Sequence, residues 1–179
     1  FDVVVLASNA IDKLIAAGRV LPGRVDIVES GIAIAVRKGA RRWPVATEDD
    51  VRRAVQSAAS LSFSTGPSGV YLEQLFQRWG ILDEVRPRIV VPPPGIPVGS
   101  LVADGKAELG FQQLSELMNL PGIDVLGPLP PAIQTLTVFS GGVCAASAAQ
   151  AQARALLDFL ASPATAELKR HHGMAPPRG

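Results

Sequence analysis

The stretch Leu61-Ser62-Phe63-Ser64-Thr65-Gly66-Pro67-Ser68-Gly69-Val70-Tyr71-Leu72 has the pattern of a short apolar strand that turns through small residues into an amphipathic helix. Its glycines let the backbone turn sharply, and Pro67 and Ser68 suit the first positions of a helix. The first N–H groups of such a helix lack intrahelical acceptors and, with the positive end of the helix dipole, favour an oxyanion. We therefore interpret the stretch as an anion-binding loop, to which Thr65 and Ser68 add hydroxyl groups.

Other interpretations of this loop must be weighed, because glycine, proline and serine also build ordinary strand-to-helix turns that bind nothing. A Walker loop is excluded, since it requires a lysine before the final Ser or Thr and none follows Gly69. The nucleophile elbow of a hydrolase requires Gly-x-Ser-x-Gly, and Gly66-Pro67-Ser68-Gly69 is one residue shorter. The loop is thus a candidate for binding rather than for covalent catalysis.

The composition is that of a globular protein without a nucleic-acid or membrane signature. The chain has 179 residues, of which 47% are hydrophobic, and its 17 basic and 16 acidic residues give a formal net charge of +1. These charges are scattered, which argues against nucleic-acid binding. No apolar stretch approaches the roughly 18 residues of a spanning helix, so we expect no membrane insertion.

Cysteine and histidine give no indication of a metal site or of a cofactor, and we expect neither. The single Cys144 lies in a small apolar run and is interpreted as a buried hydrophobic residue, with no disulfide partner. His171 and His172 are adjacent in the last predicted helix, where their side chains point about 100 degrees apart. They are poor joint ligands, and no acidic partner stands at ligand spacing. A Ser–His–Asp triad is not supported, and we expect no catalytic residue.

Strand-like and helix-like segments alternate along the chain, which predicts an α/β fold with parallel-rich sheets and flanking helices. Thr47, with Asp50 three residues later, is typical of a helix start, and Gly80 is typical of a helix end. In parallel sheets, ligands bind beyond the carboxyl ends of the strands. The expected strands are residues 1–6, 25–28, 31–36, 61–63, 88–91, 107–111, 123–126 and 133–139.

Two stiff connectors, at residues 37–44 and 127–131, enclose the middle of the chain and predict two lobes. We expect residues 1–44 and 127–179 to form the first lobe and residues 45–126 the second, with a ligand cleft between them of the kind that closes by a hinge motion. The chain starts at Phe1 with a buried-type strand rather than a polar segment. We therefore expect the N-terminal strands of the first lobe to be missing from this sequence.

Four segments in this order resemble the molybdate-binding branch of the type II periplasmic solute-binding proteins, the substrate-binding components of ABC transporters. The resemblance covers nearly the whole chain and implies the two-lobed fold of that family. No one motif is decisive, but the order and spacing agree with the family from its third strand onward. The segments are Asp2–Ser8, Gly66–Tyr71, Gly105–Phe111 and Ala161–Pro163.

The resemblance also implies ligand contacts, which fall on Ser68 in the loop, on Pro97 or Val98, and on Gln113 after the strand 107–111. This chain departs from the molybdate binders at two of them. The pair Gln112-Gln113 stands where the family presents a tyrosine, and Pro97 has no N–H to donate, although Val98 has one. The expected ligand-binding residues are Thr65, Gly66, Ser68, Gly69, Val70, Val98, Gln112 and Gln113.

These departures favour a small organic acid over molybdate, because a glutamine amide both donates and accepts hydrogen bonds. The resemblance then implies a monomeric periplasmic protein that delivers an anion to an ABC transporter permease. One alternative is an isomerase on the same scaffold, similar to aconitate isomerase, for which Ser68, Tyr71 and Glu116 are weak candidates, with Tyr71 expected in the core and Glu116 in solvent. Another is the effector-binding half of a LysR-type regulator, which shares the fold, although the end of the chain fits the solute-binding branch better.

Overall fold

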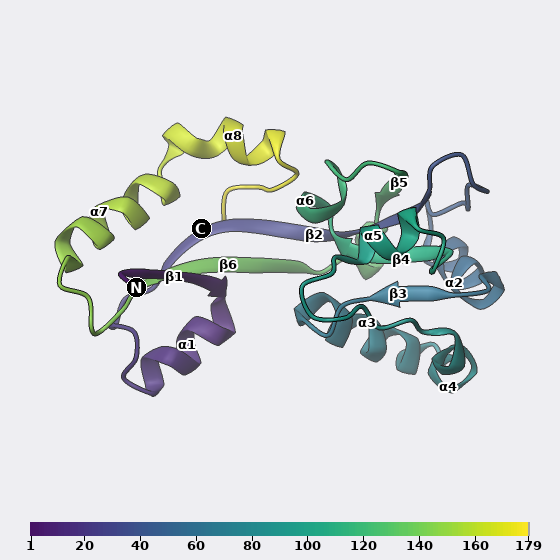
Figure 1. Ribbon diagram of the computed structural model, residues 1–179, viewed down its shortest axis with the longest axis horizontal. Coiled ribbons are helices and arrows are strands. Elements are labelled where there is room, and N and C mark those ends of the chain that lie inside the picture. Colours follow the sequence, from purple (N-terminus) through teal and green to yellow (C-terminus); the bar gives the residue numbers. More distant parts are fainter. Residues whose placement is uncertain (179) are drawn as a thin grey trace. The chain divides into compact units, whose positions relative to one another are not determined.

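The computed structural model describes residues 1–178, and the chain has an α/β fold (Figure 1). It forms two compact units. Unit 1 consists of Phe1–Ser30 and residues 136–178, and unit 2 is the continuous segment Gly31–Thr135. The chain passes between them within strand β2 (Val25–Arg37) and directly before strand β6 (Leu136–Val143). Both connectors predicted from the sequence lie inside unit 2, which extends further at both ends than the predicted lobe 45–126.

Unit 1 is built on strand β1 (Val3–Ala7), which pairs antiparallel with β6, and on the first half of β2. Gly141 and Gly142 of β6 permit close packing, because a Cβ at Gly141 would lie 2.2 Å from a methyl of Leu157, and one at Gly142 would lie 2.4 Å from a methyl of Val20. The buried core comprises Ile27, Val28, Val143, Ala153 and Leu157. The helices of this unit are α1 (Ser8–Ala16), α7 (Gln150–Ala161), the turn η3 (Pro163–Thr165) and α8 (Ala166–His171).

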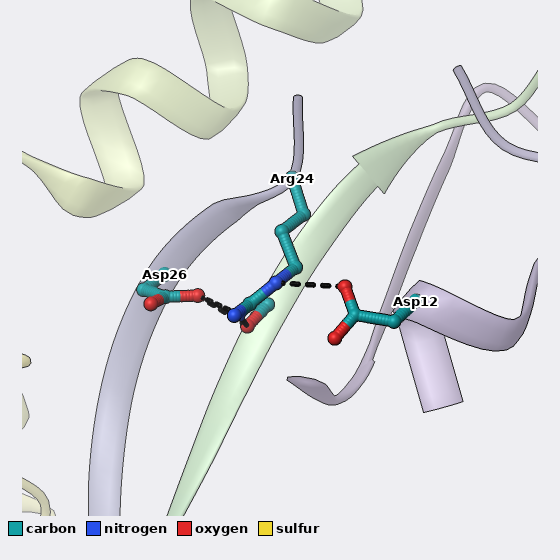
Figure 2. Close-up of polar contacts among 4 residues, drawn as sticks. Asp12, Arg24 and Asp26 are labelled. Atoms are coloured by element: carbon teal, nitrogen blue, oxygen red, sulfur yellow. Dashed lines mark hydrogen bonds and ion pairs between the residues drawn. The ribbon is translucent and has the colours of Figure 1, made fainter. Parts of the chain in front are cut away.

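One arginine connects three elements of unit 1 (Figure 2). The Nε of Arg24 lies 2.9 Å from Oδ1 of Asp12 in α1, and its Nη1 pairs with Asp26 in β2. The same Nη1 donates a hydrogen bond of 2.8 Å to the hydroxyl of Ser140 in β6, which in turn donates to Asp26 at 2.6 Å. Because Ser140 is fully buried, this network satisfies a hydroxyl that would otherwise be left without a partner in the sheet.

Unit 2 contains a mixed sheet, in which the second half of β2 lies between β4 (Leu109–Gln113) and β5 (Ile123–Pro128), antiparallel to both. Strand β3 (Leu61–Phe63) pairs parallel with β4, and Leu61 also forms a parallel bridge with Ile89. The expectation of parallel pairing therefore holds for β3 and β4, and β2 adds antiparallel pairs. The α/β fold itself is confirmed.

Helices cover both faces of the sheet in unit 2 (Figure 1). On one face, α2 (Glu48–Ser57), α3 (Pro67–Arg78) and α4 (Leu82–Val85) pack on the larger core, which includes Ile32, Ile34 and Phe111. On the other face, α5 (Val98–Ala103) and α6 (Leu114–Leu117) cover a smaller cluster with Ala33 and Ala35. This alternation along β2 is the period of a strand buried on both sides.

Several local predictions are confirmed, and others are corrected. Thr47 and Asp50 form the capping box of α2, with both hydrogen bonds present at 3.1 Å. The strand predicted at 88–91 is absent from the described residues apart from the bridge at Ile89, because Pro87 and the prolines from 92 to 94 interrupt backbone donors. Its first residue belongs instead to the turn η1 (Arg86–Arg88), and a second short turn, η2 (Pro131–Ile133), precedes the end of unit 2. The segments 25–28 and 31–36 form one strand, β2.

Candidate functional site

The loop between β3 and α3 has the geometry of a helix start whose first backbone donors lack a side-chain cap within residues 1–178. Gly66 is the N-cap and Pro67 the first helical residue, and no side chain of the described residues caps this end. The N–H of Val70 donates to the carbonyl of Gly66 at 3.1 Å, whereas the preceding N–H groups of Ser68 and Gly69 belong to the first turn, which has no intrahelical acceptors. Two backbone donors therefore stand at the positive end of a twelve-residue helix.

Gly69 lets this helix start sit against the loop. A Cβ at this position would lie 1.5 Å from the carbonyl oxygen of Ser64, a distance that no side chain can adopt. Ser64 also accepts a hydrogen bond at its hydroxyl from the N–H of Gly66, at 3.3 Å. The glycine at 69 is thus required by the close approach of the backbone and not by its own φ angle.

The side chains of the predicted loop residues differ in their exposure. Ser68 is 3% exposed, while Thr65 is exposed and Gly66 half-buried. Val70 is 52% exposed, and its N–H is already used within the helix. Among these predicted contacts, the structure leaves Val70 with the least to offer an anion.

The parallel pairing of β3 and β4 brings the remaining polar candidates to the same edge of the sheet. Phe63 and Phe111 form the last pair, after which residues 64–66 lead from β3 into α3, while β4 continues through Gln112 and Gln113. Gln112 and Gln113 are 6% and 4% exposed. Successive strand residues point to opposite faces of the sheet. Gln113 is opposite Ile32 and lies on the face of α3, whereas Gln112 is opposite Ala33 and lies on the face of α5 and α6.

Gln112 forms a pair with Glu116 in the helix that follows the strand. Its Nε2 donates to a carboxylate oxygen of Glu116, and its Oε1 is buried with no hydrogen-bond partner among residues 1–178. Burial raises the pKa of the Glu116 carboxyl above its usual range, an effect that the hydrogen bond from Gln112 partly opposes. The sequence predicted Glu116 in solvent, and its side chain is indeed exposed, although it is hydrogen-bonded to Gln112. The spacing of four residues between the two side chains was the signal that sequence reasoning missed.

Val98 is the first residue of α5 and is fully buried. Gly110 of β4 allows this helix to lie directly on the strand, because a Cβ there would approach a methyl of Val102 to 2.5 Å and one of Val98 to 3.0 Å. Val98 therefore packs against Gly110, which lies two residues before Gln112 and on the same face of β4. Its neighbour Pro97 is the N-cap of α5 and has no N–H, so Val98 is the first of the two with a backbone donor.

Other candidates have structural roles or lie elsewhere. The hydroxyl of Tyr71 donates to the carbonyl of Ile133 at 2.7 Å, and its ring packs against the larger core, as predicted. His171 and His172 are exposed in unit 1, and the described residues contain no group of metal-ligating side chains. Cys144, predicted as buried, is half-buried and lines an apolar cavity of about 340 Å³. In residues 1–178, no helix is both long enough and apolar enough to cross a membrane.

Comparison of the chain with known proteins identifies its family. Residues 1–175 match the family model described as bacterial extracellular solute-binding protein. The chain is 40% identical over 179 residues to an aconitate isomerase from a Pseudomonas species, covering 98% of this chain and 67% of that protein. Among solved structures, the periplasmic molybdate-binding protein of Azotobacter vinelandii has a TM-score of 0.78 at 21% identity, with coverage of 99% of this chain and 79% of that chain.

A tungstate-binding protein from Desulfovibrio alaskensis has a TM-score of 0.64 at 15% identity, with coverage of 99% of this chain and 79% of that chain. At these identities the structures show the shared fold, which confirms the type II periplasmic fold predicted from the sequence. The family match sets aside the interpretation as a LysR-type regulator. The chain belongs to the family of bacterial extracellular solute-binding proteins.

Proposed function

We propose that this protein is the solute-binding component of an ABC importer, that it works in the periplasm as a monomer, and that it binds a small organic acid. The binding site that we propose is the edge of unit 2 where β3 and β4 end. The observation that supports the proposal is the parallel pairing of β3 and β4, because the start of α3 and the two buried glutamines then belong to the same edge of the sheet.

The donors of this edge suit an anion that is met by neutral groups. The N–H groups of Ser68 and Gly69 and the first turn of α5 at Val98 supply backbone donors, and Gln112 and Gln113 supply amides. Carboxylates are stabilised at helix N-termini without a lysine or arginine. The amides favour a ligand that offers both donors and acceptors, which a symmetric oxyanion such as molybdate does not.

A titration of the full-length protein tests this proposal. We expect small di- and tricarboxylates to raise the melting temperature in a saturable way, because a ligand that binds only the folded state stabilises it by mass action. Replacing the buried Ser68 by tryptophan fills the helix start, so this variant should lose the shift. Gln77→Trp, at an exposed position of the same helix, is the matched control and should keep it. Unaltered ligand binding by the Ser68 variant would remove the loop from the site.

A second candidate function is isomerisation of a tricarboxylate, and the observation that favours it is the 40% identity to aconitate isomerase. Glu116 is the candidate acid or base, because it is the carboxyl group hydrogen-bonded to Gln112 at the end of β4, and desolvation raises its pKa above the usual value. Incubating the protein with cis- or trans-aconitate and following interconversion distinguishes the two functions. Turnover that Glu116→Gln abolishes would favour the enzyme, and binding without turnover would favour the receptor.

A further inference from the structure

The amide of Gln112 has one half satisfied and one half unsatisfied. An ionised carboxylate only accepts hydrogen bonds, so the bond to Glu116 must come from the Nε2 of Gln112. This bond fixes the orientation of the amide and leaves Oε1 as the remaining acceptor. That oxygen is buried and without a hydrogen-bond donor among the described residues. Buried polar atoms are nearly always paired, so an unpaired one at a candidate binding edge calls for an explanation.

The neighbours of Gln112 on this face of β4 cannot supply the missing donor from their side chains. The position opposite on β2 is Ala33, which has only a methyl group. Two residues earlier, Gly110 has no side chain and lies against Val98. Leu117 of α6 packs with Ala33. Small and apolar groups thus lie next to this carbonyl oxygen, on the face of the sheet that α5 and α6 cover.

We propose that Gln112 is a specificity-determining residue, whose Oε1 accepts a hydrogen bond from a hydroxyl group of the ligand, so that the site prefers hydroxy carboxylates to anions without a donor. In this binding role Glu116 is a positioning residue, because it holds the amide of Gln112. This inference rests on the proposed binding of a small anion at the edge where β3 and β4 end.

Matched pairs of ligands isolate the effect of the hydroxyl group. Malate differs from succinate, and citrate from propane-1,2,3-tricarboxylate, by one hydroxyl, while the carboxylates stay the same. Calorimetric titration of the full-length protein at neutral pH should show that the hydroxy member of a pair binds about tenfold more tightly, the effect expected of one net hydrogen bond. Molybdate has no donor and should bind more weakly than malate.

Two variants test the residues separately. Gln112→Met keeps a similar volume and removes the acceptor, so the ratio of malate to succinate affinity should fall to within about twofold, through weaker malate binding. Glu116→Gln replaces an acceptor-only carboxylate by an amide that can accept or donate, so the amide of Gln112 is no longer held in one orientation and the ratio should fall, while both proteins remain folded by circular dichroism. Gln77→Met and Glu73→Gln, both at exposed positions of α3, are the controls and should leave the ratio unchanged.

The possible outcomes separate this inference from the function on which it rests. If carboxylates bind and the ratio does not respond to Gln112→Met or Glu116→Gln, the inference is wrong and the proposed function stands. If succinate binds as tightly as malate to the unmodified protein, the inference is equally wrong. If none of the tested anions binds the unmodified protein, both the proposed function and the inference fail.

Discussion

At the scale of single residues, Lys169 is the clearest case of a side chain that lowers the stability of the folded protein. Its side chain is 6% exposed, and its Nζ has no hydrogen-bond partner within residues 1–178. It lines an apolar cavity of about 430 Å³ in unit 1 together with residues such as Ile27, Leu160 and Met174. Burial lowers the pKa of Lys169 from its usual 10.5, because a low-dielectric environment penalises the charged form.

We expect Lys169→Met to stabilise the folded protein. The folded-state pKa is depressed, so the penalty is fully present below that pKa, and it fades as the pH rises toward 10.5. The variant should therefore raise the free energy of unfolding by about 1–3 kcal/mol at pH 7, with a smaller gain near pH 10. Urea unfolding at the two pH values measures this. Arg170→Met, at the exposed neighbouring position, should change stability by less than about 0.5 kcal/mol. A loss of stability in Lys169→Met would mean that the ammonium has a partner.

At the scale of elements, the side chain of Gln134 connects the two ends of unit 2. Its Oε1 accepts from the N–H of Ile32 at 2.9 Å, and its Nε2 donates to the carbonyl of Ile32 at the same distance. Ile32 lies near the first residue of unit 2, and Gln134 lies next to the last one. The carbonyl of Ile32 also accepts from the N–H of Leu129 at 2.9 Å, so the amide of Gln134 supplements the pairing of β2 just beyond the end of β5.

Removing this connection should destabilise unit 2. Gln134→Leu leaves the N–H of Ile32 without its partner, while the carbonyl keeps its bond from the N–H of Leu129, and we expect a cost of about 1–3 kcal/mol in the free energy of unfolding. Denaturant unfolding followed by circular dichroism measures the loss. Gln77→Leu, an exposed glutamine in α3, serves as the comparison and should stay within about 0.5 kcal/mol of the unmodified protein. Equal stability of the two variants would show that water satisfies Ile32 in the absence of Gln134.

The sequence predicted those elements whose signals are local. The capping box at Thr47 and the helix start at Pro67 depend on residues within one turn, and both are observed. The continuity of β2 through Glu29 was not predicted, because it depends on a distant partner: Glu29 forms a bridge with Ala175, and its carboxylate accepts from the N–H of Arg178 at 2.6 Å. Pairings between residues so far apart in the sequence cannot be predicted from local sequence patterns.

The candidate site was predicted only in part, for the same reason. Ser68 and Gly69 could be named from the turn composition, and Gln112 and Gln113 from their place at the end of an apolar strand. The pairing of Gln112 with Glu116 was not predicted, because it depends on how α6 follows the strand. In the same way, Lys169 occupies an inward position of α8 that its charge would assign to solvent.

At the scale of the whole molecule, the two units differ in how the chain builds them. Unit 1 needs two distant segments, whereas unit 2 is one continuous segment with a core of its own. We therefore predict that the fragment 31–135 folds alone and unfolds cooperatively on heating, as measured by circular dichroism. The fragment 45–126, which follows the lobe borders predicted from the sequence, lacks β2 and with it Ile32 and Ile34. It should remain largely unfolded, and a cooperative transition in this shorter fragment would contradict the assigned borders.

The contact between Gly69 and the carbonyl of Ser64 has a consequence for how ligand preference can diversify on this scaffold. At 1.5 Å from that oxygen, even a methyl group would force α3 away from β3 and displace its first turn. Single substitutions at position 69 therefore cannot change the ligand preference without displacing the helix. Substitutions are sterically easier at Thr65, which is exposed, and Gln112 on the adjacent strand is the other position to vary. A library built to alter the bound solute should keep the glycine constant and randomise its surroundings.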